Sequence, residues 1–488
     1  MDWDFQKRIV VLETKLRDQQ ILTMQLEARL RESEATLAAR DVLITKLLAE
    51  ITELKRRLHL DSSNSSKPPS SDGLRKKPAP KSLRTKSGKP SGGQLGHSGA
   101  TLEQVAVPDK THVHRVTQCP HCTADLRQVA VGRIIKRQVV DLPEPRVEVT
   151  EHQAEVKRCL CCGKEVLGVF PSDVTAPVQY GHRVEAQVVY FLHQQLIPED
   201  RLQRLFEDLF GLPISTATLA NMSARFAHQA APVVAAIEAE LRGAPVKHLD
   251  ETGMRVAGKL HWLHGMGNDN ATHYRVEQKR KAIAQGLTGT IVHDHFKPYY
   301  SLPDVIHALC GGHLLRELLG LMEIEKEPWA KWMSRLLIVV CRLSRRSHGV
   351  SAPRIALLRR LYDAIVDQGI TFHETLPALK TAATRGRKKH RPGHNLLIRL
   401  RDYKDDVLRC LIDPAVPFTN NQAEQDLRMM KVKQKISGGF RTLSGARIFA
   451  TIRSVLSTAR KRGINILQAI LNLTLFNSPS GTPPPAFA

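Results

Sequence analysis

Apolar residues recur with a heptad period near the start of the chain. Counted from Ile9, the first position of each repeat is aliphatic except at Thr23, whereas the fourth position is interrupted by Gln19, Ser33 and Arg40. A heptad sustained over this length is typical of a coiled coil. We expect residues 1–60 to form a short or imperfect coiled coil that joins copies of the chain. The alternative is an amphipathic helix packed on its own protein.

Residues 61–110 carry no such period. The stretches SSNSSKPPSSD and KPSGGQLGHSG are rich in Ser, Pro and Gly, and basic residues lie between them. Such a composition buries too little apolar surface to order itself. We expect a basic disordered linker that tracks phosphates without reading base sequence, or else a plain solubilising spacer. Its cations are Arg75, Lys76, Lys77, Lys81, Arg84, Lys86 and Lys89.

Helical periodicity returns in residues 176–243. Two helical runs are separated by the turn-forming segment Gly211-Leu-Pro-Ile-Ser, and Ser215 or Thr216 can cap the second run, Ala217–Arg225. A helix, a short turn and a second helix make up a helix-turn-helix motif. We expect a helical segment that either binds DNA or simply packs as a hairpin.

Beyond Ala244 the pattern changes to strand-like segments separated by turn signals. VKHLDETGMRV, LHWLHGMG and THYRVEQ predict three strands, KRKAIAQGLTG a short helix and TIVHDHFKPYY a fourth strand. That order is the core of the ribonuclease-H-like fold, in which the first and fourth strands are neighbours. It would place Asp250, in the first strand, beside Asp294, at the end of the fourth. We assign residues 244–310 to the first part of this α/β core.

Amphipathic patterns predict an α-helical insertion that interrupts the core over residues 311–412. The core resumes over residues 413–470, and residues 471–488 form a tail. Cys310 and His313 could begin a metal site, but no partner pair is visible, so a packed helix is preferred. The whole chain is thus expected to be a multidomain α+β protein. Within the insertion, helices are expected over His313–Glu323, Trp329–Arg345 and Pro353–Gln368.

The composition adds a strong positive charge. Lys and Arg total 72 against 48 Asp and Glu, a formal net charge of +24. This excess points to a polyanionic partner, above all nucleic acid, with an anionic membrane surface as the alternative. No apolar run approaches the roughly 20 residues that span a bilayer, and the charged, periodic N-terminus is unlike a signal peptide. We expect a cytoplasmic protein associated with the bacterial nucleoid.

Cysteines cluster in residues 111–175, in two pairs with the spacing C-x2-C. In a reducing compartment such pairs are typical metal ligands, and two pairs complete a tetrahedral, structural Zn²⁺ site. Cys161 could replace Cys162, although Gly163 favours Cys162, and unliganded thiols are the alternative. The expected ligands are Cys119, Cys122, Cys159 and Cys162, and strands of a zinc ribbon are expected over Arg133–Val140 and Arg146–Val156.

Two carboxylates that converge repel each other and lose hydration unless a cation joins them. Asp250 and Asp294 would therefore share a divalent ion, Mg²⁺ or Mn²⁺, because such ions prefer oxygen ligands. A third carboxylate allows two ions about 4 Å apart, which activate the attacking oxygen and stabilise the leaving oxygen in phosphoryl transfer.

The segment PFTNNQAEQDLRMMKVKQKISGGFRT offers that third acid. Asn420 or Asn421 can cap a helix, and Glu424, Arg428 and Lys431 would share one of its faces. An acid flanked by two cations suits a metal beside a phosphate backbone. The alternative is an ordinary surface ion pair between Glu424 and Arg428.

Further cations follow this helix and also occupy a loop of the insertion, RGRKKHR. Asp426 is acidic too, but it points to a different face of the helix and is not assigned to the site. The residues expected to contact DNA are Arg428, Lys431, Lys433, Lys435 and Arg441, together with Arg385, Arg387, Lys388 and Lys389 in the insertion loop.

These motifs resemble, in order and over almost the whole chain, those of transposases of the insertion sequence 66 family. SSNSSKPPSSD and GGQLGHSG resemble its linker signatures, and the four cysteines resemble its zinc-binding domain. HLDETGMRV, VHDHFKPYY and the long, specific TNNQAEQDLRMMKVKQKISGGFRT resemble its three acidic motifs. The resemblance implies a triad of Asp250, Asp294 and Glu424 with two Mg²⁺ or Mn²⁺ ions, and Lys431 as the basic residue common in such triads. The chain departs from the family's pattern in its second cysteine pair and in GGQLGH, where Pro more often follows Gln.

The resemblance also implies an activity. A DNA transposase of this kind cleaves double-stranded DNA at the ends of its mobile element, with water as nucleophile, and then joins the freed 3′-hydroxyls to target DNA. Copies would pair through the coiled coil, and accessory proteins of the same element are further candidate partners. The alternatives are a non-catalytic dimeric DNA-binding regulator derived from such a transposase, and a membrane-surface or scaffolding protein. The second alternative leaves the acidic motifs unexplained.

Overall fold

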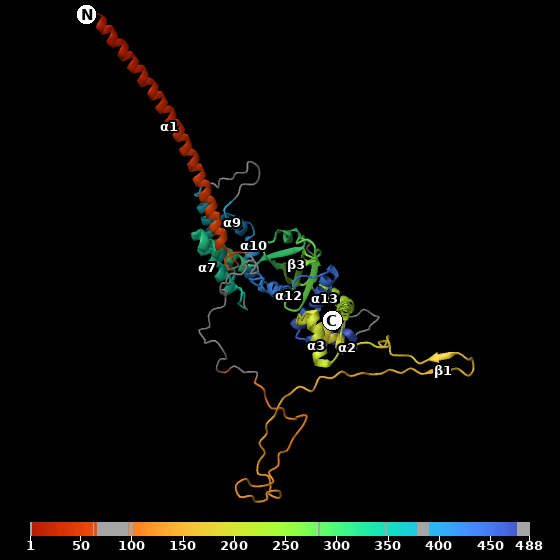
Figure 1. The fold of residues 1–488 in the computed structure, drawn as a ribbon. Helices are drawn as coiled ribbons and strands as arrows, with labels where there is room; N and C mark the ends of the chain where they lie inside the picture. The colour runs from red at the N-terminus through yellow and green to blue at the C-terminus, as the bar shows by residue number, and fades with distance from the viewer. Residues whose placement is uncertain are drawn as a thin grey trace. The chain divides into compact units, whose positions relative to one another are not determined.

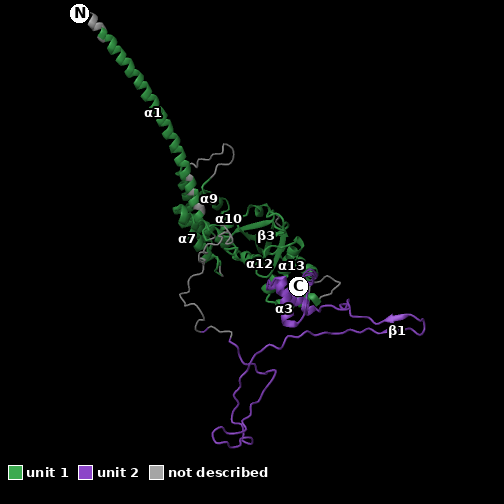
Figure 2. Cartoon of the chain, viewed as in Figure 1, with its two compact units in different colours: residues 1–79, 226–488 green, residues 80–225 purple. Residues whose placement is uncertain are grey.

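The computed structural model describes residues 2–61, 63–65, 96, 101–281, 284–346, 349–377 and 390–475. The chain divides into two compact units, residues 1–79 with 226–488, and residues 80–225 (Figure 2). Within the described residues, no helix is long and apolar enough to cross a lipid bilayer. Two groups of predicted cations lie outside these residues: those of the linker between residues 75 and 89, and Arg385, Arg387, Lys388 and Lys389 of the insertion loop.

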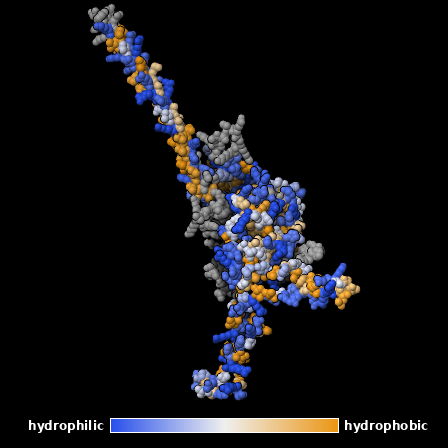
Figure 3. Space-filling view, turned by 45° about the vertical axis from the view of Figure 1, so that its right-hand side comes forward, coloured by the Kyte–Doolittle hydropathy of each residue, from blue (hydrophilic) through white to orange (hydrophobic). Residues whose placement is uncertain are grey.

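The heptad segment forms one continuous helix, α1 (Asp2–His59), which is red in Figure 1. Its aliphatic side chains remain exposed: Leu30 is 60% and Leu37 is 56% accessible to solvent. Apolar side chains are visible along α1 in the space-filling view (Figure 3). The described part of this chain does not cover that stripe.

Each predicted cysteine pair of the smaller unit lies in a tight turn. Backbone hydrogen bonds close the two turns onto the carbonyl oxygens of Cys119 and Cys159. The second turn joins two short antiparallel strands, β1 (Val156–Arg158) and β2 (Glu165–Leu167). Local hydrogen bonding therefore places the two thiols of each pair on the same small turn.

The longer ribbon strands predicted over Arg133–Val140 and Arg146–Val156 are wrong, because strand structure in this region begins only at Val156. Their apolar side chains lie in solvent, with Val139 91% and Val149 87% exposed. An isolated ribbon without a second layer gains too little burial to stabilise long strands.

The helical part of the smaller unit confirms the predicted helix, turn and helix. The first helix ends at Gly211, which adopts φ 61°, a conformation that favours glycine. Ser215 Oγ accepts a hydrogen bond from Thr218 N (3.1 Å), which confirms the predicted helix cap. Phe206, Ile214 and Met222 belong to the core of this part. Its elements are α2 (His182–Val189), the π-helix η2 (Tyr190–Gln194), α3 (Glu199–Phe210) and α4 (Thr216–Gln229).

The larger unit is built on a five-stranded sheet of order β5-β4-β3-β6-β7. β3 pairs antiparallel with β4 and parallel with β6, so the predicted neighbourhood of the first and fourth strands is confirmed. β7, which the sequence pattern did not predict, pairs parallel with β6. The strands are β3 (Val246–Val256), β4 (Lys259–Gly267), β5 (Thr272–Glu277), β6 (Gly289–His293) and β7 (Val305–Leu309).

The short helix predicted between β5 and β6 is wrong for the described residues of that stretch. Residues 279–281 and 284–288 form turns, bends and irregular backbone rather than a helix. Gly286 and Gly289 have φ values of 69° and 75°, outside the right-handed helical region. Arg280, in this connection, instead forms an ion pair with Glu251 (2.7 Å).

The helices predicted for the insertion are confirmed, and further short helices follow them. Trp329, Leu337 and Tyr362 belong to a core that continues into the sheet through Val292 and Leu309. The insertion thus packs on the β6–β7 side of the sheet. Its elements are α6 (Gly311–Gly320), the π-helix η4 (Leu321–Glu325), α7 (Pro328–Leu343), α8 (Ala352–Glu374), α9 (Pro392–Asp402), α10 (Lys404–Val407) and α11 (Arg409–Ile412).

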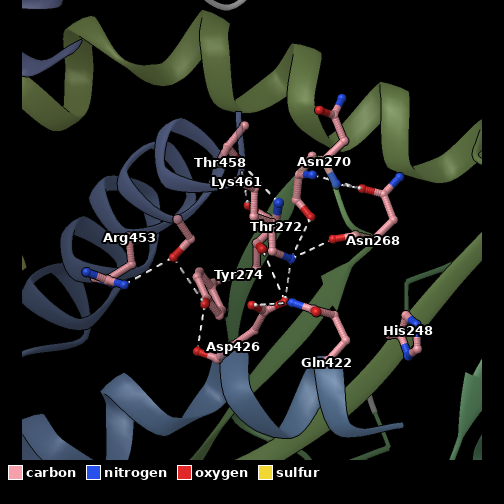
Figure 4. Close-up of polar contacts among 12 residues, drawn as sticks. His248, Asn268, Asn270, Thr272, Tyr274, Gln422, Asp426, Arg453, Thr458 and Lys461 are labelled. Carbon is pink, nitrogen blue, oxygen red and sulfur yellow. Dashed lines mark hydrogen bonds and ion pairs between the residues drawn. The ribbon is translucent and has the colours of Figure 1, made fainter. Parts of the chain in front are cut away.

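The opposite edge of the sheet, β5, is covered by a helix. α12 (Asn421–Ser437) packs on β3 and β4, and α13 (Leu443–Lys461) packs on β5 and on α5 (Ala231–Gly243). Ser454 Oγ accepts from Tyr274 N (2.9 Å). Thr458 Oγ1 accepts from Thr272 N (3.1 Å) (Figure 4). Hydroxyls of α13 thus satisfy backbone groups that a further strand would otherwise pair. A last helix, α14 (Ile466–Leu475), follows.

Asp426 ties α12 to the helix that covers the edge strand. Its Oδ2 lies 2.8 Å from Lys461 Nζ and accepts from Thr272 Oγ1 (3.1 Å), while Tyr274 Oη donates to the Asp426 carbonyl (2.7 Å) (Figure 4). Both charged side chains are nearly buried, 12% exposed for Lys461 and 10% for Asp426. Asp426 therefore has a structural role, on a different face of the helix from Glu424, and it fixes the helix that carries Glu424.

Candidate active site

Three acidic side chains converge near the centre of the sheet. Asp250 and Glu251 lie in β3, and Asp294 directly follows β6, the parallel neighbour of β3. One carboxylate oxygen from each lies within 4.8 Å of the others. The structure thus brings the predicted pair of aspartates together and adds Glu251, which the sequence analysis missed.

Burial raises the pKa of all three groups, and repulsion within the cluster adds to the rise for Asp250 and Glu251. Burial is the largest cause for Asp250, whose pKa lies well above its ordinary range, and the charges of Glu251 and Asp294 add to the rise. Burial likewise raises the pKa of Asp294 and of Glu251. Hard oxygen donors that repel one another when buried are stabilised by a shared divalent cation. The residues at this position therefore fit Mg²⁺ or Mn²⁺.

Glu251 is already engaged by neighbouring side chains. Arg280 donates to its Oε1 (2.7 Å), and Tyr299 Oη donates to its Oε2 (2.6 Å). The hydrogen bonds described for Asp250 and Asp294 use one oxygen each, Oδ1, which accepts from a backbone amide. The two aspartates are therefore better placed as metal ligands, whereas Glu251 holds the Arg280 guanidinium at the edge of the cluster.

Glu424, in the first turn of α12, lies close enough to Asp250 for its charge to contribute to the raised pKa of Asp250. Its Oε1 is 3.4 Å from Arg316 Nη2 and 3.9 Å from His313 Nε2, both on α6. Burial lowers the pKa of His313 to about 3, so Arg316 supplies the charge. Among the described residues, the ion-pair partner of Glu424 is thus Arg316 on another helix rather than Arg428.

Asn420 sets the position of α12, but not as a side-chain cap. It precedes the helix without capping it, and it is 1% exposed. Its Nδ2 donates to Leu249 O (2.8 Å) in β3, and its Oδ1 lies 2.7 Å from His248 Nδ1. The predicted capping role is wrong because these strand contacts take up the amide. They anchor the start of α12 directly beside Asp250.

A cavity of about 210 Å³ lies next to Asp294. The Arg280 guanidinium lies 4.1 Å from the Phe296 ring centroid there, and Arg399 forms an ion pair with Glu317. Two guanidinium groups beside an acidic cluster suit a ligand that carries phosphate groups. The polar and aromatic lining comprises Arg280, Asp294, His295, Phe296, His313, Glu317 and Arg399.

The predicted DNA-contacting cations of α12 and the following loop differ in exposure. Arg428, Lys435 and Arg441 are exposed, and Lys433 is half-buried. Lys431 instead donates to Gly253 O (3.3 Å) in β3, and burial lowers its pKa. Lys431 is therefore close to the acidic cluster, whereas the exposed cations are free to face a larger partner.

The four predicted zinc ligands lie in their two separate turns. Among the described residues, the structure does not gather three or more of these thiols into one cluster. Within each turn, however, hydrogen bonds lower the pKa of one thiol. The largest cause is the His121 backbone amide for Cys119 and the Cys162 backbone amide for Cys159. Lowered thiol pKa values favour the thiolate form that binds zinc.

Several residues of the site were missed or left aside in the sequence. Glu251 adjoins Asp250 in the same motif, and Arg316 follows His313 in CGGHLLRE, so both had a local signal. Arg280 and Arg399 had none, because only the fold brings them to Asp294. The interpretation of the segment after Cys310 as a packed helix is confirmed: it forms α6, and Cys310 Sγ accepts from Asn420 N (3.1 Å).

Comparison with known proteins adds three matches to family models. A model described as "Transposase IS66 family" matches residues 177–448, more than half of the chain, and includes all three predicted acids. A model described as "zinc-finger binding domain of transposase IS66" matches residues 117–163, which contain all four predicted zinc ligands. A "Family of unknown function (DUF6444)" matches residues 18–103.

One curated relative is the uncharacterized protein y4jO of Sinorhizobium fredii (strain NBRC 101917 / NGR234). It is 37% identical over 70 residues, which make up 14% of this chain and 22% of that protein. The match to this chain thus spans about a fifth of the relative's length.

Proposed function

Because this chain belongs to the IS66 family of transposases, we propose that it is a DNA transposase whose metal-dependent site contains Asp250, Asp294 and Glu424. The observation that carries the proposal is the convergence of Asp250 and Asp294 across the paired strands β3 and β6. Three antiparallel strands followed by a parallel neighbour of the first also support a ribonuclease-H-like core. The zinc-finger match supports a structural Zn²⁺ site, for which we propose Cys119, Cys122, Cys159 and Cys162 as ligands.

The proposed reaction uses one site twice. Water attacks the phosphate at the element's end and releases a 3′-hydroxyl, which then attacks a phosphate of the target DNA. Two divalent ions, when bound, would polarise the attacking and leaving oxygens. Asp250 and Asp294 hold the ligand oxygens in a buried position, and Arg316 keeps the Glu424 carboxylate beside them. Arg280 and Arg399 face the cavity next to Asp294, where they contact the phosphates of the bound strand.

DNA would extend from the site over exposed cations. Arg428, Lys435 and Arg441 lie in or just after α12, the helix of Glu424, and we assign them, with Lys433 and the insertion loop, to backbone contacts. The helices α3 and α4 have the arrangement of a DNA-reading hairpin. A second copy would cover the exposed apolar stripe of α1, because two element ends must be held together.

The test is mobilisation from a donor plasmid that carries the gene with its native flanking DNA. Wild type is compared with Asp294→Asn, which keeps the side-chain shape and removes the charge, and with a matched control, Asp304→Asn, at an exposed position. We expect insertions from wild type and the control, and none from Asp294→Asn, while DNA binding persists in all three. Equal mobilisation by Asp294→Asn would overturn the catalytic assignment. If all three proteins bind DNA and none of them mobilises it, the result favours the alternative function, a non-catalytic DNA-binding regulator.

A further inference from the structure

The segment that follows α1 is folded where the sequence predicts a disordered linker. Ser63 N and Ser63 Oγ both donate to Asp61 Oδ1 (2.7 and 2.6 Å), and Asp61 N donates to Asn64 Oδ1 (2.9 Å). Asp, Ser and Asn form turns of this kind because their short polar side chains bond to nearby backbone. The predicted disorder is therefore wrong for Asp61 and for residues 63–65, and the rest of residues 62–100, apart from Gly96, lies outside the described part of the chain.

Asn64 joins this turn to α1 and to the insertion. Its side chain is buried, and the residue is 6% exposed. Asn64 Nδ2 donates to His59 O (2.9 Å), the last residue of α1, and lies 3.5 Å from Glu323 Oε2 in η4. The carbonyl groups at the end of a helix lack partners within the helix, so the first contact terminates α1. The contact with Glu323 joins the same amide to η4 of the insertion.

The backbone of the turn packs directly against Gly320, the last residue of α6. A Cβ at this position would overlap the Asn64 carbonyl oxygen and would lie 3.8 Å from Leu60 Cδ2. Glycine is unfavourable within helices, and here its lack of a side chain permits the close approach. Leu60 also lines a small cavity with Leu321, Ile324 and Pro392, which supplies apolar contact beside the polar turn.

We propose that the turn formed by Asp61 and residues 63–65 is an anchor, and that the surface formed by the end of α6 and by η4 binds it. The occupant is this chain's own segment, which lies within the residues matched by the family of unknown function. The anchor attaches α1 to the helix that carries Arg316, the partner of Glu424. In an oligomer paired through α1, a fixed joint would set the separation of the two active sites, which a free linker could not do. This last consequence rests on the proposed function, whereas the anchor itself does not.

Hydrogen–deuterium exchange of the full-length chain tests the anchor with one variant in the turn and one variant in the surface that the turn contacts. Asn64→Ala removes the amide from the turn, and Gly320→Ala places a methyl group against it. Gly243→Ala is the matched control, because a Cβ there meets nothing within 4 Å. Exchange is followed in peptides that cover residues 59–65 and in β3, which reports on the folded core.

In wild type we expect the amides of Asp61 and of residues 63–65 to exchange at least roughly tenfold more slowly than in an unstructured peptide. Asn64→Ala and Gly320→Ala should remove that protection and leave β3 unchanged, and Gly243→Ala should change neither region. The anchor is overturned if the wild-type turn exchanges as fast as a free peptide, or if Asn64→Ala leaves its protection intact. If Gly320→Ala also speeds exchange in β3, that variant has disturbed the folded core, and the exchange of Asn64→Ala alone tests the anchor. Protection of the turn in a protein that fails to mobilise DNA overturns the proposed function alone.

Discussion

The Glu424 carboxylate on α12 lies 3.4 Å from the guanidinium of Arg316 on α6. The two helices start side by side, because the backbone amide of Asn420, just before α12, donates to Cys310 Sγ, just before α6. Asn420 is in turn bound to β3 next to Asp250. The ion pair therefore belongs to a junction that joins the insertion, the last acidic motif and the first strand of the sheet.

Replacing Arg316 by alanine should weaken the response to divalent metal more than the binding of DNA. Glu424 would lose the partner that keeps it beside Asp250, and partners that orient metal ligands typically contribute 10–100-fold to metal affinity or activity. We expect the Mg²⁺ concentration for half-maximal strand cleavage to rise roughly tenfold, with partial recovery in Arg316→Lys. A magnesium titration of cleavage measures this. Arg335→Ala, which removes an arginine that stacks on Trp332 of α7, is the control. An unchanged metal midpoint in Arg316→Ala would refute the positioning role.

The metal-free protein should become more stable when an acid of the cluster is neutralised. Burial raises the pKa of Asp294 above its ordinary value of 3.8. The folded state then holds the proton more tightly than the unfolded state, so stability falls as pH rises from about that value and stays reduced above the raised pKa. In EDTA at neutral pH, Asp294→Asn should therefore melt above wild type. Excess Mg²⁺ should raise the melting temperature of wild type and not of the variant. Melting curves with and without metal decide the point, and a variant less stable than wild type in EDTA contradicts it.

The sheet and the insertion follow from local patterns, and the exceptions have physical causes. Strand alternation located β3, β4, β5 and β6 but not β7, and amphipathic spacing located α6, α7 and α8 but not the shorter helices α9, α10 and α11. The pattern failed at the connection between β5 and β6, where glycines with positive φ prevent the predicted helix. It also failed for the zinc-module ribbon, because alternation predicts a strand only where another layer buries one face.

The site was predictable only as far as it depends on which strands are neighbours. Asp250 and Asp294 meet because Asp250 lies in β3 and Asp294 directly follows β6, the parallel neighbour of β3, which the order of elements indicated. The pairing of Glu424 with Arg316 was not predictable, because the two residues lie 108 positions apart in the sequence and only the fold brings their helices together. Asn420 shows the same limit: its place before a helix suggests a cap, but the packing of that helix on β3 gives its amide other partners.

Zinc content should depend on four thiols and not on the fifth. Cys119→Ser and Cys159→Ser should each lose bound zinc, because a tetrahedral structural site needs all its ligands. Cys161→Ser should retain about one zinc per chain, whereas Cys162→Ser should lose it. Metal analysis of the purified variants measures this. If Cys161→Ser loses zinc and Cys162→Ser retains it, the ligand of the second pair is Cys161.

Asp426 and Glu424 lie two positions apart on α12, and neutralising them should have opposite consequences. Asp426 forms a nearly buried pair with Lys461, so Asp426→Asn leaves an uncompensated charge and should lower the free energy of unfolding by about 3 kcal/mol. Glu424 is 39% exposed in its pair with Arg316, so Glu424→Gln should cost less than about 1 kcal/mol. Strand cleavage should be lost in Glu424→Gln and preserved in Asp426→Asn at temperatures where both variants are folded. Denaturant unfolding and cleavage assays on the same preparations measure the two quantities. Loss of cleavage in folded Asp426→Asn, or full cleavage by Glu424→Gln, would show that the wrong acid of this helix was assigned to the site.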